Sequence, residues 1–203
     1  AAMIDTRITP LATHHPTPAG LADINADLTQ RLVIETGAMP WEPSPSGTVW
    51  RKPLYRQGGE FGPVTSLVRY APGGSFPEHA HPEGAEILGL GGVFSDDQGD
   101  YPAGTFLMNP HGSRHAPRSA PGCTLFVRLR QYPGEDRPRL VEDTQDPAGW
   151  YPGLVEGLRV RPLYSQAGYP ENVALVRWAP GARFQRHSHW GGEEILVLEG
   201  EFA

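Results

Sequence analysis

Short apolar runs rich in β-branched and aromatic residues recur along the chain, and glycine or proline bounds most of them. The clearest runs cover residues 64–70, 86–90, 105–108, 124–130, 173–178 and 194–198. Runs of this length and composition are typical of β-strands. The 203 residues include 25 glycines and 22 prolines, more breakers than long helices tolerate. The pattern therefore predicts an all-β protein, a sandwich or barrel of short strands.

One stretch near the N-terminus has a helical period instead. Residues 1–20 show no apolar periodicity, and they are followed by four apolar residues at helical spacing, Leu21, Ile24, Leu28 and Leu32. Thr17 and Pro18 precede these residues and suit a helix N-cap and first turn. The sequence therefore predicts an N-terminal arm and a short helix over residues 1–30.

The chain contains an internal repeat. The residues Leu-Val-Arg-Tyr-Ala-Pro-Gly at 67–73 return as Leu-Val-Arg-Trp-Ala-Pro-Gly at 175–181, an offset of 108. A period this long indicates a duplicated domain, because the repeats of solenoid proteins are far shorter. We expect a first domain over residues 31–133 and a second over residues 134–203, joined by a segment rich in proline and charge.

Charge and cysteine content narrow the possible partners and the compartment. The net charge is −6 and no basic cluster is present, which argues against nucleic-acid binding. No apolar run approaches the roughly 20 residues that cross a bilayer, so no membrane span is expected. The one cysteine, Cys123, excludes an intramolecular disulfide and fits a reducing compartment. These features predict a soluble, cytoplasmic protein in which Cys123 is a buried small hydrophobe.

Two histidine pairs occupy matched positions in the repeat. His79 and His81 return as His187 and His189, again 108 residues later. Side chains two residues apart on a strand point to the same face, so each pair could form half of a metal site. A single pair of this kind more often lies on the surface or in the core without binding a metal. Its repetition at matched positions favours metal binding.

Two motifs around the first pair occur in a fixed order. The first reads Gly73-x5-His79-x-His81 and continues to Gly92, and the second reads Gly104-x5-Pro110-x-Gly112-x2-His115. Together they resemble the paired motifs of the cupin superfamily. From about Trp41 onward the chain resembles, more narrowly, the cupin domain of ChrR-type anti-sigma factors. This resemblance implies two tandem cupin jelly-roll barrels, with a metal ion held inside the first by His79, His81 and His115.

The family pattern also has a carboxylate ligand, and the two copies differ there. Glu193 meets its spacing in the second copy and would join His187 and His189. Alignment of the copies places Ala85 opposite Glu193. Glu86 could replace the missing carboxylate if its strand shifted by one residue, which would turn the side chain to the other face. Without Glu86, the first copy is a three-histidine site like those of some iron dioxygenases in the superfamily.

The second copy lacks a counterpart of His115. The offset of 108 places that counterpart near position 223, beyond Ala203. The second barrel is therefore expected to be incomplete, with unpaired strand edges that a partner chain could cover. On this basis a homodimer is predicted, with the alternative that further strands complete the second barrel.

Three functions remain open on the sequence. The first is a metal-binding regulator resembling ChrR-type anti-sigma factors. A sigma factor is a partner by resemblance only, because residues 1–30 contain no cysteine for the zinc domain that binds it in that family. The second is a non-haem metal-dependent dioxygenase acting on a small molecule. The third is a binding module whose metal stabilises the barrel. The expected ion is zinc or iron, with nickel and manganese as alternatives.

Overall fold

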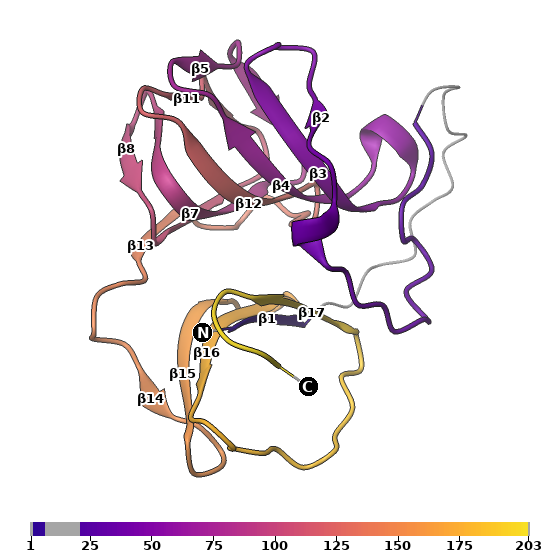
Figure 1. The fold of residues 1–203 in the computed structure, drawn as a ribbon, viewed down its shortest axis with the longest axis vertical. Helices are drawn as coiled ribbons and strands as arrows, with labels where there is room; N and C mark the ends of the chain where they lie inside the picture. The colour runs from indigo at the N-terminus through magenta and orange to yellow at the C-terminus, as the bar shows by residue number, and fades with distance from the viewer. Residues whose placement is uncertain (1, 7–20, 203) are drawn as a thin grey trace. The chain divides into compact units, whose positions relative to one another are not determined.

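The computed structural model describes residues 2–6 and 21–202 (Figure 1). The chain forms two compact units, one of residues 14–145 and one of residues 1–13 together with 146–203. Residues 134–145 pack with the first unit, where their strand pairs with the first sheet. In the described residues, the structure contains strands and two short 3-10 helices, so the all-β prediction is confirmed. No described helix has the length and apolar character needed to cross a membrane.

The first unit is built on one antiparallel sheet with the strand order β13-β9-β7-β12-β4-β3-β2. The bounds of these strands are β2 Glu42–Pro43, β3 Val49–Arg56, β4 Val64–Tyr70, β7 Ala85–Asp96, β9 Thr105–Asn109, β12 Cys123–Leu129 and β13 Leu140–Asp143. Shorter strands lie off this path: β5 Gly74–Ser75, β6 His79–His81, β8 Gly99–Pro102, β10 Ser113–His115 and β11 Arg118–Ser119. The 3-10 helices are η1 Thr36–Ala38 and η2 Gly59–Phe61.

Strand β7 belongs to two layers of the barrel. Its first residues pair with β9, whereas Val93–Asp96 pair with β8. Between the two halves its register with β12 shifts, so that Leu90 has no partner in the ladder. A bulge of this kind bends a strand and increases its twist. This bend lets one long strand run from the main sheet to the layer that carries β8.

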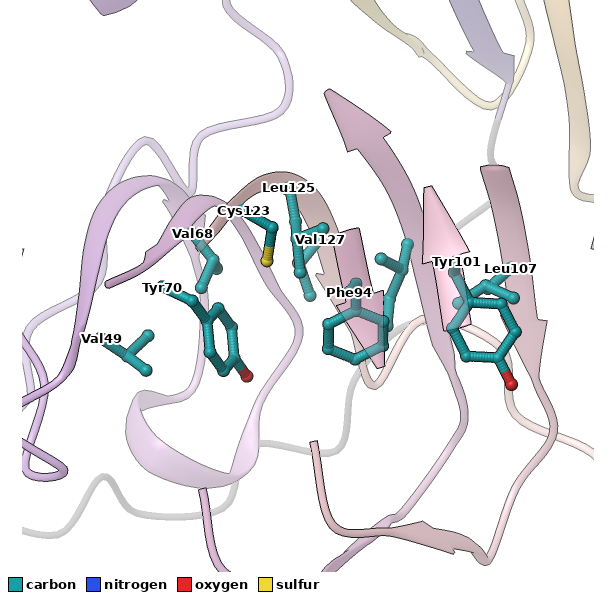
Figure 2. Packing of buried hydrophobic residues seen from close by; sticks show 10 residues of the cluster. Val49, Val68, Tyr70, Phe94, Tyr101, Leu107, Cys123, Leu125 and Val127 are labelled. Atoms are coloured by element: carbon teal, nitrogen blue, oxygen red, sulfur yellow. The ribbon is translucent and has the colours of Figure 1, made fainter. Parts of the chain in front are cut away.

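The core of the first unit lies inside the barrel (Figure 2). Alternate residues of β12, namely Cys123, Leu125 and Val127, face it, as the period of two on a strand requires. Cys123 is 6% exposed, which confirms that it is a buried side chain. The other members of the cluster are Val49, Val68, Tyr70, Ile87, Phe94, Tyr101 and Leu107.

The second unit repeats the central part of this sheet. Its order is β14-β15-β16-β1-β17, with bounds β14 Tyr151–Pro152, β15 Leu158–Ser165, β16 Asn172–Trp178, β1 Ala2–Thr6 and β17 Glu193–Val197. A cation–π contact also recurs: Arg69 lies 4.1 Å from the ring of Trp41, and Arg177 lies 4.6 Å from that of Trp150. Both features support a duplicated unit.

Strand β1 occupies the place in the second sheet that β12 has in the first. Phe126 of β12 pairs with Leu67 and Leu88, while Met3 of β1 pairs with Leu175 and Leu196. The partners in the two sheets differ by the offset of 108, so the registers coincide. The N-terminal arm predicted for this region therefore contains a central strand.

The short N-terminal helix is not present in the described residues. Residues 21–32 are non-helical, and Ile24 instead pairs with Arg56 through a backbone bridge. The Asp27 side chain accepts hydrogen bonds from the backbone amide and the hydroxyl of Thr29, a turn that competes with a helix. Asn25 adopts a φ of 51°, which also breaks a helix. The predicted cap residues Thr17 and Pro18 lie outside the described residues.

Candidate metal centre

Two short strands position three histidines. Strands β6 and β10 pair antiparallel, with His79 opposite His115 and His81 opposite Ser113. His79 and His81 share a face because they are two residues apart, and His115 joins them from the neighbouring strand. The pairing thus brings together residues that are 34 or more positions apart in the sequence.

The three side chains converge on one point. One ring nitrogen of each histidine lies within 4.8 Å of those of the other two. The Nε2 atoms of His81 and His115 are 2.8 Å apart. His81 and His115 are 7% and 5% exposed, and His79 is half-buried. Among the residues that the structure describes, these three histidines form the group whose ligand atoms lie close enough together to hold one metal ion.

Hydrogen bonds fix the tautomers of two of these rings. His79 Nδ1 lies 3.0 Å from the carbonyl oxygen of Pro77, which can only accept, so Nδ1 carries the proton. His115 Nδ1 lies 3.1 Å from Oδ2 of Asp96, a carboxylate that likewise accepts. In the neutral rings the Nε2 lone pairs of both histidines are therefore free of protons. Metal-ligating histidines have this arrangement, with the second nitrogen held by an acceptor.

Asp96 is held in its ionised form. Burial alone would raise its pKa, but hydrogen bonds from the backbone amide of Gln98, from His115 and from the Tyr101 hydroxyl together lower the pKa below its usual value. Asp96 is the last residue of β7. Sequence reasoning missed it, since an acidic residue at the end of a strand is too common to single out.

His81 and His115 are held in the neutral form that binds metals. Burial, together with the nearby His115, His79 and Arg130, lowers the pKa of His81 to about 3. Burial also lowers the pKa of His115, although Asp96 acts in the opposite direction. A neutral imidazole is the form that coordinates a cation, so both side chains are ready to bind near pH 7.

These three residues fit a divalent ion. Bonds from imidazole to zinc are about 2.0–2.1 Å long, so two nitrogens 2.8 Å apart can reach the same ion. Three protein nitrogens leave coordination positions open on zinc, iron, nickel or manganese. Two of these three ligands, His79 and His115, are oriented by neighbouring acceptors. The donor set does not select one of these metals.

Glu86 lies with other partners. Its Oε2 accepts hydrogen bonds from Arg128 Nη1 at 3.0 Å and from the Tyr132 hydroxyl, and both Glu86 and Arg128 are fully buried. Residue 86 has the opposite parity to Ile87, which lines the barrel interior on the same strand. The structure thus places Glu86 in a buried ion pair and not beside the three histidines.

The predicted ligands of the second copy lie on a more open segment. The Nε2 atoms of His187 and His189 are 2.7 Å apart, and Glu193 Oε1 lies 3.4 Å from His189 Nε2. His187 and His189 are outside the strands, and Glu193 begins β17. The His187 side chain is exposed. The structure therefore brings these residues together only as sequence neighbours, without a third element across from them among the described residues.

A cavity of about 700 Å³ opens inside the first unit next to the histidines. The side chains of His79, His81 and His115 line part of it, and core residues such as Tyr70 and Phe94 line another part. The volume falls in the range of small-molecule sites, about 300–1,000 Å³. An ion bound by the three histidines would face this space.

Comparison with known proteins assigns the chain to a family. A family model described as ChrR Cupin-like domain matches residues 29–133 and 139–203. No curated protein matches the sequence. Several solved structures resemble the fold, and the family assignment rests on the family model because these likenesses are weak.

Three of these solved structures are described by their sequence identity, coverage and TM-score. The complex of Rhodobacter sphaeroides SigE with the anti-sigma ChrR shares 23% identity over 47% of this chain and 51% of the matched chain, with a TM-score of 0.40. An RmlC-like cupin protein from Ralstonia eutropha JMP134 shares 21% sequence identity over 60% of this chain and 82% of the matched chain, with a TM-score of 0.45. An acetylacetone dioxygenase from Acinetobacter johnsonii shares 15% sequence identity over 49% of this chain and 72% of the matched chain, with a TM-score of 0.41. This chain spans about half the length of the matched ChrR-complex chain, and by the family model it belongs to the ChrR cupin-like domain family.

Proposed function

We propose that the first unit binds one divalent metal ion through His79, His81 and His115 and acts as the metal-dependent sensing module of a ChrR-like regulator. The observation that supports this most directly is the buried convergence of three imidazole nitrogens, two of which have their tautomers fixed by Pro77 and Asp96. When bound, the ion supplies a Lewis acid with open coordination positions. Zinc and iron are the ions we expect first.

The residues around the site have distinct tasks in this proposal. Asp96 orients His115 and keeps the proton on its Nδ1, and the Pro77 carbonyl does the same for His79. The apolar wall that includes Phe94 excludes bulk water from the histidines. Glu86 is left out of the ligand set because its carboxylate is engaged by Arg128.

A second candidate function is a metal-dependent dioxygenase. It is favoured by the cavity of about 700 Å³ beside the histidines and by Ala85, which stands where the second copy has Glu193. Three histidine ligands and an adjacent cavity leave room for both a small substrate and oxygen. Contact with a sigma factor, a cytoplasmic location and a homodimer also remain predictions for this chain.

Metal analysis of protein purified without added metal tests the proposal. We expect about one ion per chain in the wild type and its loss when His79 and His81 are both replaced by alanine. The control is His111→Ala, since His111 lies in the same region but its Nδ1 accepts a hydrogen bond from the Glu83 amide. Substoichiometric metal in the wild type, or metal retained in the double variant, would contradict the assignment.

Oxygen consumption separates the two functions. Tightly bound zinc with no oxygen uptake supports the sensor. Bound iron together with oxygen uptake in the presence of a small diketone supports the dioxygenase. The His187→Ala and His189→Ala double variant should leave either result unchanged, since these side chains belong to the other unit.

A further inference from the structure

The cavity of the first unit combines an apolar wall with a cationic end. Its apolar lining includes Val68, Tyr70, Ile87, Phe94, Leu125 and Val127, all members of the buried cluster shown in Figure 2. Such a wall gains free energy by burying a hydrocarbon or aromatic group. An inorganic anion would make no use of it.

Arginine predominates among the charged residues that line the same cavity. Three arginines, Arg51, Arg56 and Arg130, line it together with two glutamates, Glu42 and Glu78. Glu78 is turned to an outside partner, because its Oε1 accepts two hydrogen bonds from the Arg114 guanidinium at 3.0 and 2.8 Å. Arginines therefore outnumber carboxylates among the residues that line the cavity.

Among these three arginines, Arg130 is the one whose charge acts on the pKa of His81. It follows β12 directly, and its charge contributes to the lowered pKa of His81. Its backbone has a φ of 58°, a left-handed conformation rare for a residue with a side chain, and its amide donates to the Gly84 carbonyl at 3.0 Å. This backbone bond holds the half-buried Arg130 at the cavity.

A missing carboxylate adds to the positive charge. In the second copy, Glu193 Oε1 lies 3.4 Å from the second histidine of the pair. The equivalent residue of the first copy is Ala85, which is fully buried and shares the face of Ile87. An ion held by three neutral histidines keeps its full charge of +2, since no protein carboxylate reduces it.

We propose that the cavity binds a small organic carboxylate, with its carboxylate directed to the histidine-bound ion and Arg130 and its apolar body against the buried cluster. This rests on the proposed metal site and names the class of ligand that the site takes. The ligand's carboxylate occupies the chemical place that Glu193 has in the second copy. Arg130 is suited to the task, since a guanidinium can donate two parallel hydrogen bonds to one carboxylate.

Calorimetric titration with benzoate and with its uncharged analogue benzamide tests the proposal. We expect benzoate to bind the metal-loaded protein about tenfold or more tightly than benzamide, as charge-assisted hydrogen bonds imply. Acetate should bind more weakly than benzoate, because it leaves the apolar wall uncovered. Metal content is measured in the same samples.

Variants of Arg130 locate the effect. Arg130→Gln should remove the preference for benzoate, and Arg130→Lys should retain part of it. The matched control is Arg31→Gln, which removes the same charge from an exposed residue of the same unit that does not line the cavity. Equal binding of benzoate and benzamide by the wild type, or a preference that survives Arg130→Gln, would overturn the proposal.

A second variant tests whether the ligand's carboxylate binds the histidine-held ion. Ala85→Glu should keep its metal and lose affinity for benzoate, because the new side chain supplies the carboxylate internally. Retained benzoate affinity in a folded, metal-loaded Ala85→Glu protein contradicts this part of the proposal, and the Arg130 series decides the ligand class even if Ala85→Glu fails to fold. Wild-type protein that shows the Arg130-dependent preference but contains no metal contradicts the proposed function and the contact between ligand and ion, and it supports the ligand class and the role of Arg130.

Discussion

His115 donates a hydrogen bond from Nδ1 to Oδ2 of Asp96 over 3.1 Å, and the two side chains are 5% and 1% exposed. This buried bond links the end of β7 to the histidine cluster. It orients an imidazole whose other nitrogen faces the two remaining histidines. The first prediction concerns the removal of the negative charge of Asp96.

Asp96→Asn should weaken metal binding about tenfold to a hundredfold, the usual cost of losing a partner that orients a histidine ligand. The asparagine keeps the size of the side chain but no longer stabilises the orientation and basicity of His115. Competition titration against a chelator measures the change. Asp97→Asn is the control, because Asp97 is adjacent and 63% exposed. An unchanged dissociation constant for Asp96→Asn would show that this bond does not support the site.

Glu86→Gln should lower the free energy of unfolding by about 3–5 kcal/mol, because it leaves the charge of Arg128 buried without its carboxylate. Urea denaturation of metal-free protein measures the loss. Glu78→Gln breaks an exposed ion pair with Arg114 and should cost no more than about 1 kcal/mol. Folded Glu86→Gln should keep its metal. Loss of the metal with unchanged stability would instead identify Glu86 as a ligand.

Cys123 should stay protonated and unreactive in the native protein at mildly alkaline pH. Burial raises the pKa of its thiol above the ordinary value of 9.0, despite hydrogen bonds that act the other way. Above that ordinary value the unfolded thiol ionises more readily than the native one, so the contribution of this residue to stability falls as pH rises. Reaction with a disulfide reagent at pH 8 should be slow in buffer and fast in urea. A steeper loss of stability above pH 9 in Cys123→Ala than in the wild type would contradict this.

Gly92→Ala should destabilise the first unit much more than Gly73→Ala. Both glycines have a positive φ, 72° and 73°, which costs a residue with a side chain about 1–2 kcal/mol. At Gly92 an added Cβ would also lie 2.0 Å from the Gly122 carbonyl oxygen, whereas nothing lies within 4 Å at Gly73. Thermal unfolding of the two variants measures the difference. Equal melting temperatures would mean that the backbone at Gly92 can move away from β12.

The strands and the pair His79 and His81 could be predicted from the sequence because both depend on short-range patterns and on the internal repeat, whereas His115 was expected from the resemblance to the cupin motifs. The period of two placed His79 and His81 on one face, and the structure has them there. The same parity argument explains why Glu86 faces away from them. Local periodicity was enough for these features, since a slip of one residue would turn every side chain to the other face.

Other features depend on contacts between distant residues. The helical spacing near Leu21 was overridden by a backbone bridge from Ile24 to Arg56 and by the turn at Asp27. Strand β1 pairs with β16, more than half the chain away, so nothing in its own short sequence indicates a central strand. Arg130 reaches the cavity through an unusual φ at the end of β12, and no sequence pattern marks that conformation.

The pairing of β6 with β10 has a mechanical consequence. The two strands are three residues each and form a two-stranded sheet of their own. An ion held by His81 and His115 would cross-link positions that are 34 residues apart, as a disulfide does. Closing a loop of that length restricts the unfolded chain by on the order of 4 kcal/mol in the chain-entropy model. Loss of the ion would remove this cross-link, and the effect would fall first on the short β6–β10 pair, which has no other strand beside it in its sheet.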